Sequence, residues 1–159
     1  MARTTGSTSR CRQSFMPPGA EAYGSGTALV FDTSAWNRQR HPSVLPRWQA
    51  TLAAGLLTVC PVVSLELLAS ARDEQAFRDL DGALAALAQA PITRAACDRA
   101  LGASRELAGE RRLPAADYLI AAAAAERGFG ILHYDRHFEP LCRVLGIESV
   151  LIAPRGELD

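Results

Sequence analysis

The segment Pro114–Phe138 decides the fold, and it reads PAADYLIAAAAAERGFGILHYDRHF. Its first half has the apolar spacing of a helix, between Pro114, which suits a first helical turn, and Gly128, a typical helix stop. Its second half contains a short apolar run, 130–134, that predicts a buried strand. A helix followed directly by a buried strand predicts one unit of an α/β fold.

Two carboxylates lie at the borders of these predicted elements. Asp117 falls on the apolar face near the start of the helix, and Asp135 comes directly after the strand. An acid on an apolar face needs a partner, because an unpaired buried charge is costly. Asp117 alone also has a purely structural explanation, since free N–H groups and the dipole at a helix start favour an acid.

Strands and helices alternate along the rest of the chain. Apolar runs predict further strands at 27–31, 56–60 and 149–153, and apolar periodicity predicts helices at 42–54, 61–72, 73–90, 93–110 and 136–145. The strands are apolar without alternation, which is typical of a parallel sheet covered on both faces. The sequence therefore predicts an α/β fold built around such a sheet.

The two ends of the chain differ from the middle. Residues 1–26 are rich in Ser, Thr, Gly and Arg, contain one acid, Glu21, and lack apolar periodicity. This composition predicts a disordered N-terminal tail, with a transit peptide or a true start at Met16 as alternatives. We expect one domain at 27–154 and a short C-terminal tail at 155–159.

The overall composition excludes several classes of protein. The chain has 159 residues and a formal net charge of zero, so no global field attracts it to nucleic acid or membrane. All 17 basic residues are Arg. The four cysteines are too far apart in sequence for a zinc knuckle, and no apolar run has the length of a membrane span. We therefore expect a cytoplasmic protein with reduced thiols.

Four acids occupy positions that suit a metal site. Asp32 follows the strand 27–31, and Glu66 falls on the predicted apolar stripe of the helix 61–72, as Asp117 does on its own helix. Carboxyl ends of parallel strands meet at one edge of a sheet, so these acids and Asp135 are expected to converge and to require a cation. Such oxygen ligands favour Mg²⁺ or Mn²⁺, and this chemistry suits phosphodiester hydrolysis.

Four motifs in order resemble those of a known family. They are FDTSAW at 31–36, SLELL at 64–68, PAADYLIAA at 114–122 and LHYD at 132–135. Together they resemble the PIN-domain nucleases, in particular the VapC-type toxins of toxin–antitoxin pairs. The resemblance covers roughly 27–154, which is nearly everything outside the predicted tail.

The resemblance implies both a fold and an activity. The implied fold is a three-layer α/β/α sandwich with a central, mostly parallel sheet. The implied activity is Mg²⁺- or Mn²⁺-dependent cleavage of RNA, neutralised by a small antitoxin encoded alongside. By position, Asp32 and Asp117 match the principal metal ligands. Glu66 and Asp135 match the acids that complete the metal shell or orient the attacking water.

Five further residues are candidates for contacts with substrate. Many family members have a second acid two residues after the position of Asp135, and this chain has His137 there. His137 either weakens a second metal site, contacts a substrate phosphate, or is a solvent-facing residue of a first helical turn. Thr33 and Ser34 either hydrogen-bond an acid or a phosphate, or cap the next helix. Arg111 and Arg112 either hold RNA backbone or form a solvated pair in a loop.

Apolar helical residues outside the site suggest partner surfaces. Val44, Trp48, Phe77 and Leu84 exceed what one small core needs, so we expect an antitoxin groove and a homodimer face there. Trp36 and Trp48 either stack on bases or belong to the core or a partner contact.

Other functions remain open from the sequence. A PIN-like module that binds RNA or protein without cutting is the main alternative, and His137 keeps it open. A phosphatase or dehalogenase using Asp32 as nucleophile usually needs an Asp where this chain has Ser34, and a catalytic Lys, which this chain lacks. A nucleotide-binding fold is disfavoured because no glycine-rich loop follows the first strand.

Overall fold

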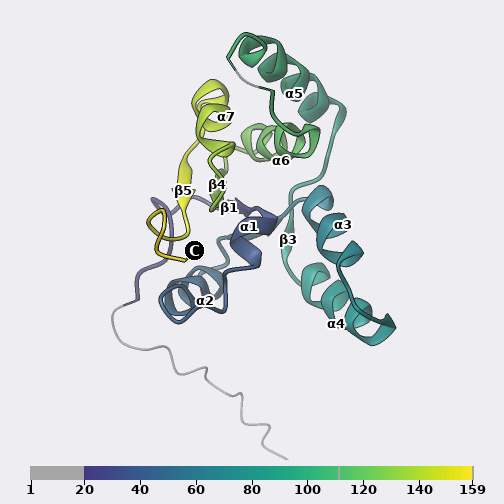
Figure 1. Ribbon diagram of the computed structural model, residues 1–159, viewed down its shortest axis with the longest axis vertical. Coiled ribbons are helices and arrows are strands. Elements are labelled where there is room, and N and C mark those ends of the chain that lie inside the picture. The colour runs from purple at the N-terminus through teal and green to yellow at the C-terminus, as the bar shows by residue number, and fades with distance from the viewer. Residues whose placement is uncertain (1–19, 111, 159) are drawn as a thin grey trace, which may run out of the picture.

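A computed structural model describes residues 20–110 and 112–158 of the chain (Figure 1). Within them, five parallel strands form one sheet in the order β3-β2-β1-β4-β5. The strands are β1 Leu29–Phe31, β2 Leu57–Val59, β3 Ala88–Gln89, β4 Gly130–His133 and β5 Ser149–Leu151. The helices are α1 Thr33–Trp36, α2 Leu45–Ala53, α3 Pro61–Ala69, α4 Glu74–Ala85, α5 Arg94–Leu107, α6 Ala115–Glu126 and α7 Phe138–Leu145.

Helices cover both faces of the sheet. On one face, α6 packs against β1 and β4, α7 packs against β4 and β5, and α5 packs on both helices from outside. On the other face lie α1 and α2, where the ring of Trp48 meets that of Phe31 at 5.4 Å between centroids. Figure 1 shows α5, α6 and α7 above the sheet and α1 and α2 below it, with α3 and α4 to one side. The predicted three-layer α/β/α architecture is therefore confirmed.

The helix α6 is the central element of the packed core. Ile120 and the four alanines at 121–124 are fully buried, and these small side chains let the helix lie close to the sheet on one side and to α5 on the other. Gly128 ends the helix region with a φ of 68°, a left-handed conformation that glycine adopts without strain. Pro114 is the residue before the first helical one, so α6 begins one position later than predicted.

The predicted helix 73–90 is wrong in its last turn. The helix α4 ends at Ala85, and Ala88–Gln89 form the edge strand β3, which pairs with Thr58 and Val59 of β2. A two-residue strand is too short to show any pattern in the sequence, so only pairing with β2 reveals it.

The folded domain begins before residue 27. Tyr23, which the sequence analysis placed in the tail, is 1% exposed. Its hydroxyl donates to the carbonyl of Ile152 at 2.6 Å, and the Arg47 guanidinium lies 4.1 Å from its ring centroid. At the other end, the amide of Gly156 donates to the hydroxyl of Tyr134 at 2.9 Å. The predicted tail over 1–19 lies outside the described residues, which contain no helix long and apolar enough to span a membrane.

Candidate active site

The strand order predicts a ligand site at the carboxyl ends of the strands. After β1, the chain builds β2 and β3 on one side and then crosses back to add β4 and β5 on the other. Ligands of open parallel sheets bind beyond the carboxyl ends of the strands at such a reversal point. Asp32 directly follows β1, and Asp135 lies two residues after the neighbouring β4, so both acids belong to this edge.

Asp32 is held rigidly at the end of β1. It is 6% exposed, its amide donates to the carbonyl of Leu132 at 2.9 Å, and its Oδ2 accepts from the amide of Ser34 at 2.9 Å. Asp32 itself is thus the cap of α1, whereas the sequence suggested that Thr33 or Ser34 caps this helix. Burial raises the pKa of Asp32, although its hydrogen bonds with Ser34 oppose the shift.

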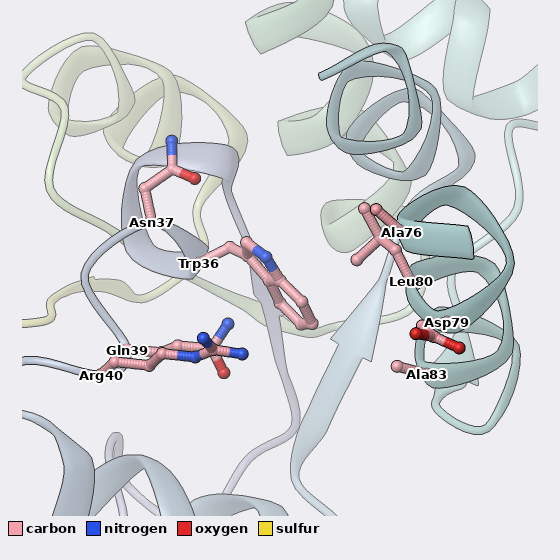
Figure 2. A pocket seen from close by; sticks show the side chains of 8 residues that line it. All are labelled: Trp36, Asn37, Gln39, Arg40, Ala76, Asp79, Leu80 and Ala83. Carbon is pink, nitrogen blue, oxygen red and sulfur yellow. The ribbon is translucent and has the colours of Figure 1, made fainter. Parts of the chain in front are cut away.

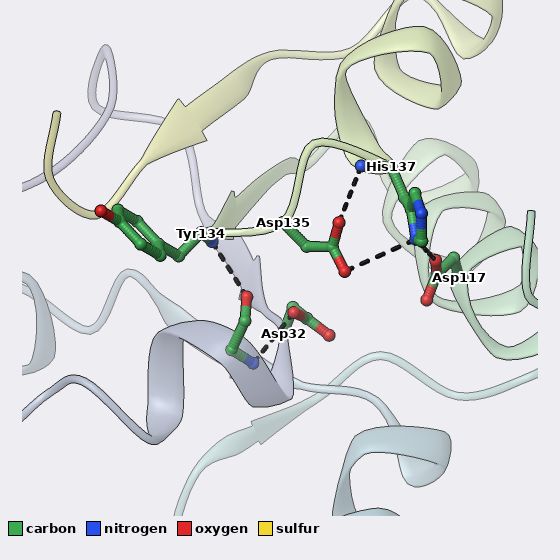
Figure 3. A network of polar contacts seen from close by, with 6 residues as sticks. Asp32, Asp117, Tyr134, Asp135 and His137 are labelled. Carbon is green, nitrogen blue, oxygen red and sulfur yellow. Dashed lines mark hydrogen bonds and ion pairs between the residues drawn. The ribbon is translucent and has the colours of Figure 1, made fainter. Parts of the chain in front are cut away.

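Asp117 and Asp135 share one histidine, His137 (Figure 3). The His137 Nδ1 lies 3.0 Å from Oδ2 of Asp117 and 3.5 Å from Oδ2 of Asp135, and its amide donates to Oδ1 of Asp135 at 2.9 Å. His137 is therefore not a solvent-facing residue of a helical turn: it faces two of the predicted site acids. The sequence offered no signal for this contact, because it joins the start of α6 to the turn before α7.

Negative charge is concentrated around Asp117. Burial is the largest cause that raises its pKa to about 6, and the nearby charge of Asp32 adds to the shift. The hydrogen bond and charge of His137 act in the opposite direction without cancelling it. A carboxylate whose negative charge is disfavoured by burial and by a neighbouring acid is stabilised by any cation that enters the site.

The residues present fit a divalent cation. One ligand atom from each of Asp117, Asp135 and His137 lies within 4.8 Å of the other two. Carboxylate oxygens suit Mg²⁺ and Mn²⁺, and an imidazole nitrogen is a common ligand of transition ions. Asp32 stands outside this group of three, but its charge reaches Asp117.

Glu66 does not face the core, which corrects the prediction for helix α3. The buried residues of α3 are Val63 and Leu67, while Glu66 is exposed and its neighbour Leu65 is 68% exposed. Glu66 is nevertheless tied to the site, because Oγ1 of Thr33, next to Asp32, donates to its Oε2 at 2.5 Å. Its charge also raises the pKa of Asp32.

The remaining predicted contact residues have different environments. The Ser34 Oγ accepts from the amide of Tyr134 at 2.9 Å, so it joins α1 to the turn that carries Asp135 (Figure 3). The Arg38 guanidinium lies 4.3 Å from the ring centroid of Tyr134, a pairing that the sequence analysis missed. Arg112 is exposed, and Arg111 lies outside the described residues.

A cleft of about 590 Å³ lies between α4 and the region that follows Asp32 (Figure 2). Trp36, which stacks on Phe31 at 5.4 Å, points toward Leu80 of α4, and Arg40 and Asp79 line the cleft on opposite sides. Each side of the cleft therefore carries both apolar and charged side chains.

The apolar residues that suggested partner surfaces are mostly core residues. Val44, Trp48 and Leu84 are 0%, 4% and 2% exposed, so they cannot form a groove or a dimer face, and Trp48 cannot stack on a base. Of the four, only Phe77 is exposed, at 43%. It lies on α4, one residue from Ala76 of the cleft.

Comparisons with known proteins agree with this architecture. The family model described as "PIN domain" matches residues 29–144. The chain is 36% identical over 137 residues to Ribonuclease VapC18 of Mycobacterium tuberculosis, covering 82% of this chain and all of that protein. It is 35% identical to Ribonuclease VapC51 of the same organism, covering 82% and 96% of the two chains.

Solved structures share the fold at lower sequence identity. VapBC2 from Rickettsia felis, bound to a DNA fragment, matches with a TM-score of 0.64 at 14% identity over 79% of this chain and 98% of that one. DNA-bound VapBC from Salmonella typhimurium matches with a TM-score of 0.62 at 19% identity, over 80% and 99%. With a family model that covers most of the described domain and relatives above 30% identity, the chain belongs to the PIN domain family.

Proposed function

We propose that this protein is a metal-dependent endoribonuclease and the toxin of a type II toxin–antitoxin pair in the cytoplasm. The observation that carries the proposal is the acidic edge of the sheet, where ligand atoms of Asp117, Asp135 and His137 lie within 4.8 Å of one another and the charge of Asp32 helps burial to raise the pKa of Asp117 to about 6. Support for RNA as substrate comes from the relatives named ribonuclease VapC, which align over 82% of the chain.

The four acids have two roles in the proposed reaction. A divalent cation held by Asp32, Asp117 and Asp135 would polarise the phosphodiester and lower the pKa of a water molecule. Ser34 fixes one oxygen of Asp32 through its amide and the turn before Asp135 through its hydroxyl. Glu66 is exposed beside Asp32 and is placed to orient water or to accept its proton.

The activity test uses Asp32, because a matched control exists. Asp32→Asn removes a ligand charge but keeps a side chain that can cap α1. Asp73 caps α4 in the same way, by accepting from the amide of Ala76 at 2.8 Å, and it is exposed and carries none of the site contacts described above. We expect Asp32→Asn to lower RNA cleavage about a thousandfold or more and Asp73→Asn to leave it unchanged.

The assay is cleavage of a transfer RNA pool with Mg²⁺, with Mn²⁺ and with chelator. Cleavage that persists in chelator, or in a folded Asp32→Asn protein, would contradict the mechanism. A wild type that binds RNA but cuts none under any condition would favour the alternative, a catalytically weak PIN-like module that binds RNA or protein.

We also propose that the small antitoxin docks in the cleft between α1 and α4. Similar solved structures include a member of the VapBC family of toxin–antitoxin systems and a toxin–antitoxin complex, and the cleft combines apolar side chains with Arg40 and Asp79. Leu80→Glu should prevent co-purification with the antitoxin. Leu101→Glu, at a 53% exposed position of α5 away from the cleft, should not.

Homodimer formation is a further part of the proposal. Three of the four apolar residues that suggested it are core residues, and only Phe77 is exposed, so the proposal now depends mainly on the family. Light scattering on the purified protein would test it, and a strict monomer at high micromolar concentration would contradict it.

A further inference from the structure

We propose that His137 is a nitrogen ligand of the metal and makes the site prefer Mn²⁺ over Mg²⁺. The inference rests on the proposed function, because it assigns the ion that the acids hold. It concerns the one position at which this chain departs from the acidic pattern of the family.

The position of the imidazole suits coordination. A single atom, Nδ1, approaches both carboxylates, at 3.0 Å from Asp117 and 3.5 Å from Asp135. Neighbouring ligands of an octahedral ion with bonds of about 2.1 Å lie about 3.0 Å apart. The two separations from Nδ1 are therefore close to those of neighbouring ligands around one ion, and the Asp117 and Asp135 ligand atoms lie within 4.8 Å of each other. Binding of an ion would replace the present hydrogen bond of Nδ1.

A backbone hydrogen bond holds His137 beside Asp135. The amide of His137 donates to Oδ1 of Asp135, so the backbone that carries the ring and the acid beside it are fixed relative to one another. The His137 side chain is 30% exposed, and those of Asp117 and Asp135 are 13% and 39% exposed. An ion can thus enter from solvent, and the imidazole keeps its proton on Nε2 when Nδ1 binds.

The type of ligand atom decides the preference. Mg²⁺ binds oxygen ligands and gains little from imidazole, whereas first-row transition ions bind nitrogen more strongly. Of these ions, Mn²⁺ also suits the carboxylates that supply the rest of the site. An acid at position 137 would add charge and favour both ions, but a histidine adds a nitrogen that discriminates between them.

Two substitutions at position 137 distinguish the effect of a side-chain charge from the effect of a nitrogen ligand atom. His137→Asp restores the acid, and His137→Asn places a neutral oxygen close to the position of Nδ1. His41→Asn is the control, because His41 is exposed and its Nδ1 bonds only locally, to Oγ of Ser43 at 2.9 Å. Both positions are at least partly exposed, so folding should be retained in all three variants.

The experiment measures metal binding rather than activity. Calorimetric titration gives the dissociation constants for Mg²⁺ and Mn²⁺, and pulsed electron paramagnetic resonance of the Mn²⁺ protein detects a directly bound nitrogen. The wild type and His41→Asn should show nitrogen coupling. Both His137 variants should lose it, and their preference for Mn²⁺ over Mg²⁺ should fall about tenfold.

The failure of this inference differs from the failure of the proposed function. The role of His137 would be overturned if the wild type bound metal in an Asp32-dependent way but showed no nitrogen coupling. It would also be overturned if His137→Asn kept the preference for Mn²⁺ over Mg²⁺. Either result would leave the nuclease proposal standing. A wild type that binds neither ion would overturn both.

Discussion

Helices α3 and α6 each place one acid at the site, yet their environments differ strongly. Both are apolar helices near a proline, and their sequences suggest the same arrangement, with one acid on a core-facing stripe. In the structure, α6 lies between the sheet and α5, and Asp117 is largely buried at its start. By contrast, α3 lies to one side against α4, and Glu66 is exposed (Figure 1).

The surroundings of the two acids decide how strongly each carboxylate charge is disfavoured. Asp117 has a raised pKa because burial and Asp32 disfavour its carboxylate, so it gains most from a cation. The Glu66 side chain is exposed to solvent and accepts a hydrogen bond from Thr33. The two acids therefore differ in how much each would gain from a bound cation: Asp117 is largely buried, whereas Glu66 is exposed.

The largest expected effect of this difference is on activity. Asp117→Asn should lower RNA cleavage about a thousandfold or more, because it removes a metal ligand, while Glu66→Gln should lower it by about a hundredfold. Single-turnover rates for both variants at saturating Mn²⁺ would measure the difference. Equal losses would mean that Glu66 also binds the ion directly, and the proposed division between the two helices would be wrong.

The second-largest expected difference between α3 and α6 is in the stability that each helix contributes through buried side chains. Ile120 of α6 is fully buried, so Ile120→Ala should lower the free energy of unfolding by about 2–5 kcal/mol. Leu65 of α3 is 68% exposed, so Leu65→Ala should change it by about 0.5 kcal/mol or less. Denaturant unfolding of both variants provides the measurement. A large loss for Leu65→Ala in the isolated protein would indicate that α3 is covered by a second copy.

The smallest effect concerns the pH dependence of stability. In the metal-free fold, the pKa of Asp117 is about 6, above its ordinary value near 4, so the folded state retains a proton that the unfolded state has lost. The stability that Asp117 contributes by this proton is present at low pH and is lost as the pH rises through about 6.

Unfolding curves in chelator would measure this effect. The free energy of unfolding of the wild type, relative to Asp117→Asn, should fall between about pH 4 and 6 and then level off. Saturating Mn²⁺ should remove the fall, because the ion stabilises the carboxylate. A relative stability that rises over this range would show that Asp117 is stabilised as an anion by His137, even without metal.

Much of the domain could be predicted because its pattern is local. The apolar runs around β1, β2, β4 and β5 have no alternation, and the helices between them have clear apolar periodicity, so the parallel sheet follows from the sequence. The acids after β1 and β4 are expected at one edge of the sheet, because the carboxyl ends of parallel strands lie at the same edge.

The predictions for Glu66 and Tyr23 are wrong because the burial of each side chain depends on elements that are distant in sequence. Nothing in the apolar sequence of α3 shows that it lies beside the sheet, so the orientation of Glu66 was predicted wrongly. Tyr23 follows a segment without periodicity, and its burial depends on Ile152 and Arg47, which are distant in sequence.

The sequence alone predicts the parallel sheet, all its strands except β3, and the positions of Asp32 and Asp135 after two of them, because apolar runs and strand ends are local properties of the chain. Only the tertiary structure decided that His137 lies between Asp117 and Asp135. That contact depends on how the start of α6 packs beside the turn after β4, and the pKa of Asp117 depends on the burial and charges that this packing creates. Electrostatic interactions act through space, so the chemistry of the site was set by the fold and not by spacing along the chain.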